Sequence, residues 1–271
     1  MAKPALSASA KYSSRSHCDA GNVIRQRPFG GGQRRQWYPS VVVSERVGAI
    51  VVSAGDSTRM RGVDKAVALL AGVPLVARTV EVFEASPVVD EIVVVASNHN
   101  LADLAKLSGE RGWRKVSAVR LGGPRRQDSV RLGLCMLGEC EWVLVHGGAR
   151  PLVSERLIVD GLAAARETGA AIAAVRPKDT MKQLRGDGRI GRTLNRERLV
   201  AVQTPQVFRR ALLADAHDKI IRDVTDDAAM VERIGAEVIV YEGDYANIKV
   251  TTPEDLAVAQ ALLAGAEATG D

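Results

Sequence analysis

From Val47 onward, short apolar runs rich in Val, Ile and Ala alternate with amphipathic segments of helical length. This alternation constrains the fold more than any other feature of the sequence. Runs that are apolar at successive residues are typical of strands covered on both faces, and strands that alternate with helices imply a mostly parallel sheet. The pattern therefore predicts an α/β fold, a three-layer α/β/α sandwich with a Rossmann-like sheet.

The predicted elements follow directly from these runs. The strands are Gly48–Ser53, Glu91–Ser97, Val116–Leu121, Trp142–His146, Ala170–Arg176 and Glu237–Tyr241. The helices are Val76–Ala85, Ala102–Glu110, Gln127–Leu137, Ser154–Thr168 and Asp226–Ile234, with a last helix beginning at Thr252.

One segment, Met181–Leu194, breaks the alternation. It places Asp187-Gly188 between two short alternating runs, which is a strong hairpin signal. A hairpin inserted into such a domain has little to pack on, so we expect an arm at about residues 178–198 that is used in dimerisation. The G-x-G-x-x-G pattern of Gly186, Gly188 and Gly191 lies in this arm. A dinucleotide site needs a strand before that pattern and a helix after it, so we assign it no nucleotide role.

The basic character of the chain is confined to its start. The net charge is +5, but residues 1–40 contain seven Lys or Arg residues and one Asp, so the body is close to neutral. A segment of this composition cannot bury enough apolar surface to offset its ordering entropy. We therefore expect a disordered basic tail at residues 1–45, one folded domain at 46–265 and a flexible C-terminus at 266–271. The tail lacks interleaved stacking aromatics, which argues against nucleic-acid binding.

Other features bear on the compartment. No apolar run approaches the roughly 18 residues that a membrane span needs, so no membrane association is expected. Three cysteines, Cys18, Cys135 and Cys140, are too few and too scattered for a disulfide framework or a zinc site. We expect a cytoplasmic location. The basic, Ser-rich start also matches a transit peptide, which would direct the chain to a plastid, and an over-extended start codon or a species-specific extension would explain it equally.

Candidate ligand-binding residues follow the strands, because open α/β sheets bind ligands beyond the carboxyl ends of their strands. The first strand is followed by Ala54 and Gly55, and then by Arg59 and Lys65. Small residues allow the backbone to approach a phosphate, and the cations supply positive charge where a phosphoryl group gains negative charge. The spacing is not that of a P-loop, and a glycine turn with two solvated basic residues remains the alternative.

Two later loops repeat this composition. Gly122 and Gly123 follow the third strand and open a helix, and a glycine pair follows the fourth strand after His146. Each loop taken alone is equally compatible with a helix cap or a turn, and a lone histidine under a sheet is more often a satisfied core residue than a catalyst. The recurrence of basic and small residues after successive strands favours a phosphate-binding edge.

Taken together, these motifs resemble the 2-C-methyl-D-erythritol 4-phosphate cytidylyltransferase family of the non-mevalonate isoprenoid pathway, from about Gly48 to Leu263. The most specific motifs are Ala54-Gly55…Arg59-Met60…Lys65, Arg126…Asp128-Ser129-Val130, Ala149-Arg150-Pro151, Asp179-Thr180-Met181-Lys182, Gln203-Thr204-Pro205-Gln206, Thr225-Asp226-Asp227-Ala228 and Asn247-Ile248-Lys249-Val250-Thr251.

The resemblance implies a nucleotidyltransferase domain at 46–265 that joins CTP to a polyol phosphate and releases pyrophosphate, with Mg²⁺ as the cofactor and a homodimer as the assembly. It also implies a set of residue roles. The implied catalytic residues are Arg59, Lys65, Arg196 and Lys249; the nucleotide-binding residues are Ala54, Gly55, Gly122, Gly123, Arg126 and Ser129; the substrate-binding residues are Arg150, Thr180 and Thr204.

The sequence departs from the family pattern at three positions. Gly147 stands where family members carry a metal-binding aspartate, so that Asp226 is the remaining candidate ligand for the metal. Pro124 stands where an acid is common, and Asp64 where proline is usual. Two alternatives follow: a ribitol 5-phosphate cytidylyltransferase, and a catalytically impaired protein that binds nucleotide without turnover.

Overall fold

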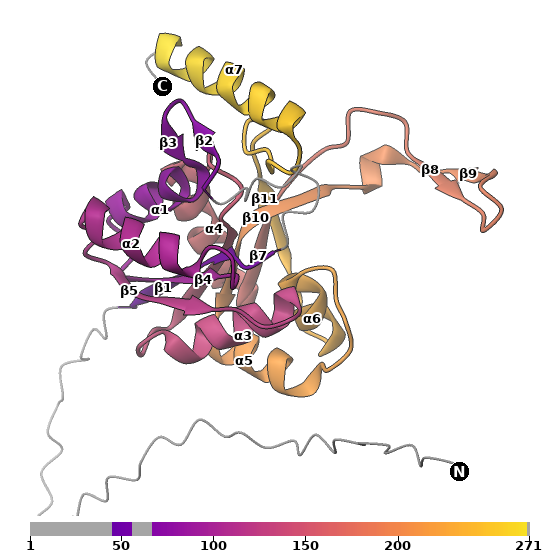
Figure 1. The fold of residues 1–271 in the computed structure, drawn as a ribbon. Helices are drawn as coiled ribbons and strands as arrows, with labels where there is room; N and C mark the ends of the chain where they lie inside the picture. The colour runs from indigo at the N-terminus through magenta and orange to yellow at the C-terminus, as the bar shows by residue number, and fades with distance from the viewer. Residues whose placement is uncertain (1–44, 56–66, 270–271) are drawn as a thin grey trace, which may run out of the picture. The chain divides into compact units, whose positions relative to one another are not determined.

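The chain folds around a seven-stranded sheet with the strand order β11-β7-β10-β6-β1-β4-β5 (Figure 1). This computed structural model describes residues 45–55 and 67–269. Each strand predicted from the sequence is present, and these six strands run parallel wherever they pair with one another. Their bounds are β1 Val47–Ser53, β4 Glu91–Ala96, β5 Val116–Leu121, β6 Trp142–Gly147, β7 Ala170–Val175 and β11 Ile239–Glu242.

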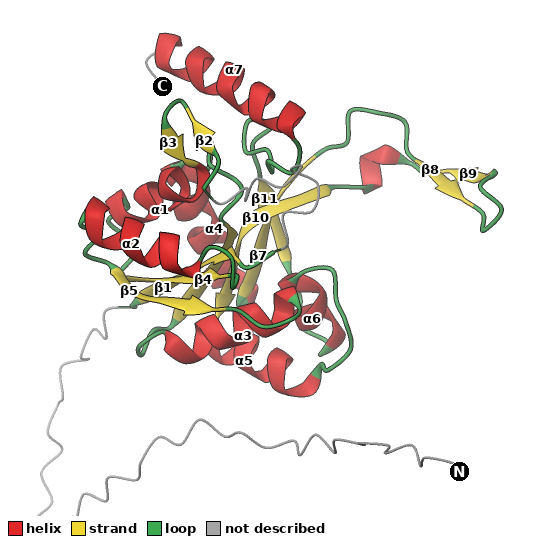
Figure 2. Cartoon of the chain, in the orientation of Figure 1, coloured by secondary structure: helices red, strands yellow, loops and turns green. Residues whose placement is uncertain are grey.

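Helices cover both faces of the sheet, as the three-layer prediction requires (Figure 2). On one face, α1 (Leu75–Ala85), α2 (Leu101–Arg111) and α4 (Glu155–Thr168) pack on inward-facing residues of the strands. On the other face lie α3 (Arg126–Met136), α5 (Arg210–Lys219) and α6 (Asp227–Arg233). Successive residues of β1 alternate between the two cores, with Ala49 and Val51 in the first and Ile50 in the second. This explains why the strands read as continuous apolar runs.

Strand β10 (Ala201–Arg209) and helix α5 were not predicted. Strand β10 lies between β6 and β7 and is antiparallel to both. Proline within a run argues against a central strand, because it lacks an N–H for the ladder. Here Pro205 falls in an irregularity, since the register between β10 and β7 shifts between Val202 and Gln206. The Gln203–Gln206 motif is therefore part of a buried strand.

Two small ribbons lie outside the main sheet. Strands β2 (Leu69–Leu70) and β3 (Val73–Pro74) form a hairpin that shares a small apolar core with α7 (Pro253–Thr269). Helix α7 begins as predicted after Thr252, and it continues past residue 265, where the domain was predicted to end. Within the described ranges, none of the helices is both long and apolar enough to span a lipid bilayer.

The predicted arm is the hairpin of β8 (Lys182–Leu184) and β9 (Ile190–Thr193), whose residues are all exposed. The Arg185 N–H donates to the Arg189 carbonyl at 2.8 Å, which closes a three-residue loop with Gly188 at φ +78°. Positive φ at the last loop position is typical of such hairpins and favours glycine. The G-x-G-x-x-G pattern therefore belongs to the arm, as expected.

Close packing of α3 on the sheet depends on Gly133. A Cβ added at Gly133 would lie 2.6 Å from Cγ2 of the buried Ile50, whereas a Cβ at Gly109, on α2, would meet no atom of the described residues within 4 Å. We expect Gly133→Ala to lower the free energy of unfolding by about 1–2 kcal/mol, because overpacking exceeds the gain in helix propensity.

Gly109→Ala is the matched control, and it is expected to raise the free energy of unfolding by up to about 1 kcal/mol. Urea unfolding followed by circular dichroism measures both changes. A similar rise in both variants would show that α3 does not pack on the sheet this closely.

Candidate active site

A cavity of about 680 Å³ lies at the carboxyl edge of the sheet. The loops that follow β1, β4, β5 and β6 line it, together with Lys249 from the segment before α7. Parallel register brings these loops together, because Ser53 at the end of β1 pairs with Ala96 of β4, and Val52 pairs with Gly147 of β6. A cavity of this size is ordinary for a small-molecule site.

The glycines of these loops allow the loops to pack closely around the cavity. A Cβ at Gly122 would lie 2.6 Å from the Ala54 Cβ, and one at Gly148 would lie 2.0 Å from the Ser53 Oγ. Their amides are already used: Gly122 N–H donates to the Ala96 carbonyl at 2.8 Å, and Gly148 N–H donates to the Val52 carbonyl at 2.9 Å. These two glycines therefore let neighbouring loops pack against each other, and their N–H groups bond to strands rather than facing the cavity.

The charge of the cavity comes from cationic side chains. Arg125, Arg126 and Lys249 line it, and none of the described lining residues is an aspartate or a glutamate. Lys249 is placed there because the N–H of the next residue, Val250, donates to the Ala149 carbonyl at 2.8 Å. A concave surface of one sign concentrates oppositely charged ligands. The arrangement suits a polyanion such as a nucleoside triphosphate.

His146 lies fully buried beneath the cavity and is held in a chain of hydrogen bonds. The Gly147 N–H donates to the Thr204 Oγ1 at 3.2 Å, and this hydroxyl lies 3.1 Å from Nδ1 of His146. Nε2 lies 3.3 Å from the Arg150 carbonyl, which only accepts, so the neutral ring carries its proton on Nε2.

Burial lowers the pKa of His146 to about 3, with nearby Arg150 and Arg126 adding to the effect, so the ring is neutral at physiological pH. A buried, neutral imidazole with both nitrogens bonded does not exchange protons with a substrate. His146 is therefore structural, as its position under the sheet suggested. Thr204, predicted to bind substrate, is buried, and its hydroxyl is part of this chain of hydrogen bonds.

Arg150 lies beside this core. Its guanidinium donates to the Asn247 carbonyl at 2.6 Å, and it is outside the residues that line the cavity. Burial lowers its pKa to about 10, with Arg126 adding to the effect, so Arg150 stays charged at neutral pH. The positive charge of Arg126 therefore acts on Arg150, which is itself outside the residues that line the cavity.

A second cavity, of about 660 Å³, lies at the base of the arm and contains Arg196. Arg176, Lys178 and Tyr245 also line it, and the Lys178 ammonium lies 4.0 Å from the centre of the Tyr245 ring. The Arg196 guanidinium donates to the Lys178 carbonyl at 2.6 Å. Within this chain Arg196 thus lines a different cavity from Arg126 and Lys249, and Thr180 is exposed in the segment that leads to the arm.

Comparison with known proteins identifies the family. Residues 47–265 match the family model described as IspD, 2-C-methyl-D-erythritol 4-phosphate cytidylyltransferase. The chain is 49% identical over 221 residues to the enzyme of that name from Dehalococcoides mccartyi (strain CBDB1), covering 82% of this chain and 97% of the relative. It is 43% identical to the one from Bacillus cytotoxicus over 218 residues, covering 79% of this chain and 96% of that relative.

Solved structures agree. The 4-diphosphocytidyl-2C-methyl-D-erythritol synthase from Anaerococcus prevotii superposes with a TM-score of 0.72 at 29% identity, over 81% of this chain and 99% of that one. The cytidylyltransferase from Thermus thermophilus superposes with a TM-score of 0.65 at 32% identity, over 80% of this chain and 98% of that one.

The chain belongs to the 2-C-methyl-D-erythritol 4-phosphate cytidylyltransferase family. This confirms the resemblance inferred from the motifs, and the α/β fold is shared with solved members of the family. The ribitol alternative is not favoured, because these relatives carry the erythritol name.

Within this fold, the predicted nucleotide-binding residues lie around one cavity, together with the predicted catalytic residue Lys249. Seven predicted residues line the first cavity: Ala54, Gly55, Gly122, Gly123, Arg126, Ser129 and Lys249. Ser129 Oγ accepts a hydrogen bond from the Gly123 N–H at 3.1 Å, which fixes the glycine loop on the first turn of α3. Arg59 and Lys65 lie outside the described residues, so their catalytic roles stay predictions.

Asp226, the candidate metal ligand, is occupied elsewhere. Its Oδ1 accepts from the Ala229 N–H at 3.0 Å and caps α6, and its Oδ2 accepts from Gln206 at 2.7 Å. It is not among the residues that line the cavity. Capping α6 is therefore the role that the described contacts of Asp226 support.

Sequence analysis missed Asn98 and His99, which follow β4 and line the first cavity. The same rule that singled out the loops after the other strands would have found them. The pairing of the Asp227 carboxylate with Arg126 was not predicted either. No local pattern signals that pair, since the two residues lie 101 positions apart.

Proposed function

We propose that this protein transfers CMP from CTP to 2-C-methyl-D-erythritol 4-phosphate and releases pyrophosphate. The observation that carries the proposal is the first cavity, which combines glycine-rich walls with Arg125, Arg126 and Lys249 and has no acidic side chain among its described residues. The substrates proposed here are those that the names of the relatives give.

In this reaction an oxygen of the 4-phosphate attacks the α-phosphorus of CTP. A new P–O bond forms, the bond between the α-phosphorus and the bridging oxygen breaks, and pyrophosphate leaves with the electron pair. Such a step needs positioning and positive charge more than a strong base. Arg126 and Ser129 would orient the nucleotide, and Lys249 would hold the attacking phosphate; Arg59 and Lys65 would stabilise the charge on the α- and leaving phosphates.

Turnover tests the proposed activity directly. With CTP, Mg²⁺ and 2-C-methyl-D-erythritol 4-phosphate, the protein should release pyrophosphate, and ribitol 5-phosphate should be the poorer substrate. Lys249→Met removes the cation that would hold the attacking phosphate and should lower kcat/KM by about 100-fold. A coupled pyrophosphate assay measures each rate.

Lys106→Met is the matched control, because Lys106 is exposed on α2, where it pairs with Glu110 at 3.6 Å. It should leave the rate unchanged. Tight binding of CTP without any release of pyrophosphate would instead support the catalytically impaired alternative.

The residues described around the cavity do not fit a bound divalent cation. No group of three His, Cys, Asp or Glu side chains able to hold a metal occurs in the described ranges. Position 147 has no carboxylate, and Asp226 caps α6. The expected Mg²⁺ dependence stays a prediction.

Gly147 offers a direct test of this point. Among the residues that the structure describes, a Cβ there would meet only the Thr204 Oγ1, at 3.9 Å, so a side chain fits beside them. In EDTA, Gly147→Asp should weaken CTP binding about tenfold, because the new carboxylate repels the phosphates. Added Mg²⁺ should reverse that loss and lower the metal concentration needed for half-maximal turnover. Isothermal titration calorimetry measures the binding.

Gly147→Asn, which has the same size and no charge, is the control. It should bind CTP equally with and without metal. If both variants respond to Mg²⁺ as the wild type does, position 147 does not face the phosphates.

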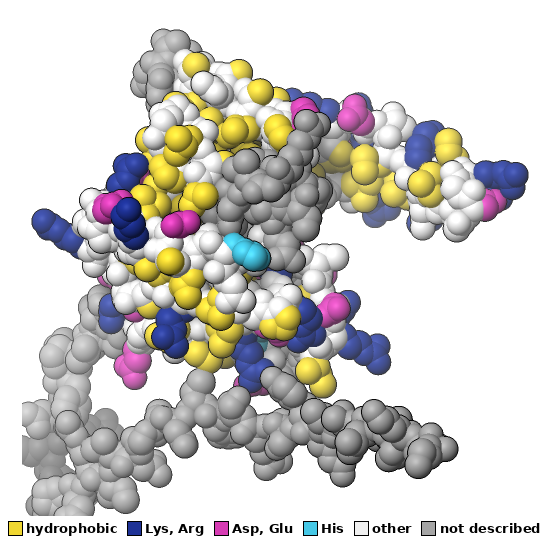
Figure 3. Space-filling view, viewed as in Figure 1, with side chains coloured by type: hydrophobic (Ala, Val, Ile, Leu, Met, Phe, Trp, Pro, Cys, Tyr) yellow, Lys and Arg dark blue, Asp and Glu magenta, His cyan; other side chains and the backbone are white. Residues whose placement is uncertain are grey.

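We also propose that the arm joins two subunits into a homodimer. Its support is the exposed apolar surface of the hairpin, where Leu184 is 63% and Ile190 59% exposed (Figure 3). Because Arg196 and Thr180 lie at the base of this arm, dimerisation would bring them toward the partner's cavity. The cytoplasmic location and the role of residues 1–45 stay predictions.

The arm makes its own prediction. Leu184→Glu should convert a dimer to a monomer in sedimentation velocity, because a buried interface charge without a partner is costly. Leu132→Glu, on the exposed face of α3 (44% exposed), should leave the dimer intact. A monomeric wild type would contradict the proposal.

A further inference from the structure

We infer that Asp227 is a positioning residue that holds the Arg126 guanidinium in the nucleotide cavity. The inference rests on the proposed function, because it assumes that Arg126 binds the nucleotide. Asp227 does not line the cavity and would act only through Arg126.

Asp227 is a carboxylate in the apolar core. It is the first residue of α6, its side chain is fully buried, and it is followed by the core residues Ala228, Met230 and Val231. A buried carboxylate without a partner is strongly unfavourable. Its Oδ2 accepts from the Arg126 Nη1 at 2.5 Å, and its Oδ1 is buried with no hydrogen-bond partner. Arg126 is thus the hydrogen-bonding partner of this carboxylate.

Arg126 needs such a partner to stay in place. Its side chain is one-third exposed, so water is accessible to it, and it lies near enough to the cationic Arg150 to lower the pKa of that residue. Repulsion between the two guanidinium groups would move Arg126 toward solvent. The buried Asp227 carboxylate attracts the Arg126 guanidinium and so opposes this repulsion. The guanidinium then remains at the cavity, where it can contact a ligand.

The position of Asp227 is fixed independently of Arg126. Gln206 of β10 accepts from the Ala228 N–H at 3.3 Å and donates to Asp226 at 2.7 Å, which ties the start of α6 to the sheet. The start of α6 would therefore keep its place if the ion pair were removed. Asp227 therefore has a fixed position, and its negative charge attracts the Arg126 guanidinium.

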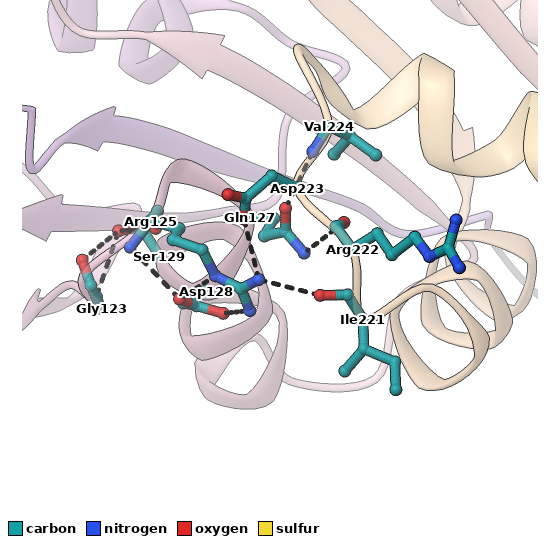
Figure 4. Close-up of polar contacts among 9 residues, drawn as sticks. All are labelled: Gly123, Arg125, Gln127, Asp128, Ser129, Ile221, Arg222, Asp223 and Val224. Carbon is teal, nitrogen blue, oxygen red and sulfur yellow. Dashed lines mark hydrogen bonds and ion pairs between the residues drawn. The ribbon is translucent and has the colours of Figure 1, made fainter.

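The start of α3 is also tied to the segment that precedes α6 (Figure 4). Arg125 donates to the Ile221 carbonyl at 2.9 Å and to Asp223 at 3.0 Å. Gln127 donates to the Arg222 carbonyl at 3.3 Å and accepts from the Val224 N–H at 3.2 Å. The bond of Arg125 to the Ile221 carbonyl and the two bonds of Gln127 lie on either side of Arg126 in the chain, and they join the start of α3 to the segment before α6. The adjacent acids thus have separate tasks, with Asp226 capping α6 and Asp227 orienting the arginine.

Asp227→Asn tests the inference, because it keeps the volume and removes the charge. We expect the Kd and the KM for CTP to rise about tenfold, while kcat and the KM for the polyol phosphate change less than threefold. A double-mutant cycle then separates positioning from general structure. In the Arg126→Gln background, Asp227→Asn should have no further effect on the Kd for CTP.

Asp223→Asn is the matched control. It removes the carboxylate from the neighbouring ion pair with Arg125, but Asp223 is exposed and Arg125 keeps its bonds to Asp128 and to the Ile221 carbonyl. It should change the Kd for CTP less than twofold. Should Asp227→Asn fail to fold, Asp227→Glu shifts the same charge by one methylene and should still raise the KM for CTP with kcat retained.

The outcomes distinguish the two proposals. If the wild type binds CTP and Asp227→Asn binds it equally well, the inference is wrong and the proposed function stands. If Asp227→Asn weakens CTP binding by the same factor with Arg126 and with Gln at position 126, Asp227 has a structural role only, and the inference is again wrong. If the wild type binds no CTP, the proposed function fails and the inference fails with it.

Discussion

The site depends on the register of three parallel strands. Because β1 pairs in parallel with both β4 and β6, Ser53, Ala96 and Gly147 end their strands at the same edge of the sheet. Every loop that lines the first cavity starts from that edge or packs against it. Register in a sheet with both faces buried is strongly specified, since a one-residue slip would exchange the two apolar cores. The position of the cavity is therefore set by core packing.

The same physics explains what the sequence could predict. Strands with Val and Ile at successive positions can be recognised from the sequence alone. The residues that follow them can then be placed at the carboxyl edge of the sheet, where ligands bind. Strand β10 could not be recognised, because Gln203, Thr204 and Gln206 are polar and Pro205 argues against a strand. Their burial is possible because each polar side chain has a hydrogen-bond partner. Gln203 donates to the Asp244 carbonyl, Gln206 donates to the Asp226 carboxylate, and the Thr204 hydroxyl bonds to Nδ1 of His146. Such partners are set by tertiary structure.

The glycine loops illustrate a second limit. A glycine pair after a strand predicts that other atoms pack closely against its backbone. The sequence does not show whether those atoms belong to a ligand or to another loop. Around Gly122 and Gly148 it is made by Ala54, Ser129 and Ser53, and the amides bond to neighbouring strands. Charge in the described part of the cavity therefore comes from side chains on long, flexible stems. Such side chains need fixed partners if they are to meet a ligand in one orientation.

This requirement connects Gly147 with the arginines. A carboxylate at position 147 would lie at the carboxyl edge beside the cavity, where it would attract either a metal ion or a neighbouring guanidinium. The negative charge that offsets Arg126 comes from Asp227, which does not line the cavity. Arg126 is thus held by a carboxylate outside the cavity lining, so the positive charge of its guanidinium can still meet a polyanion there.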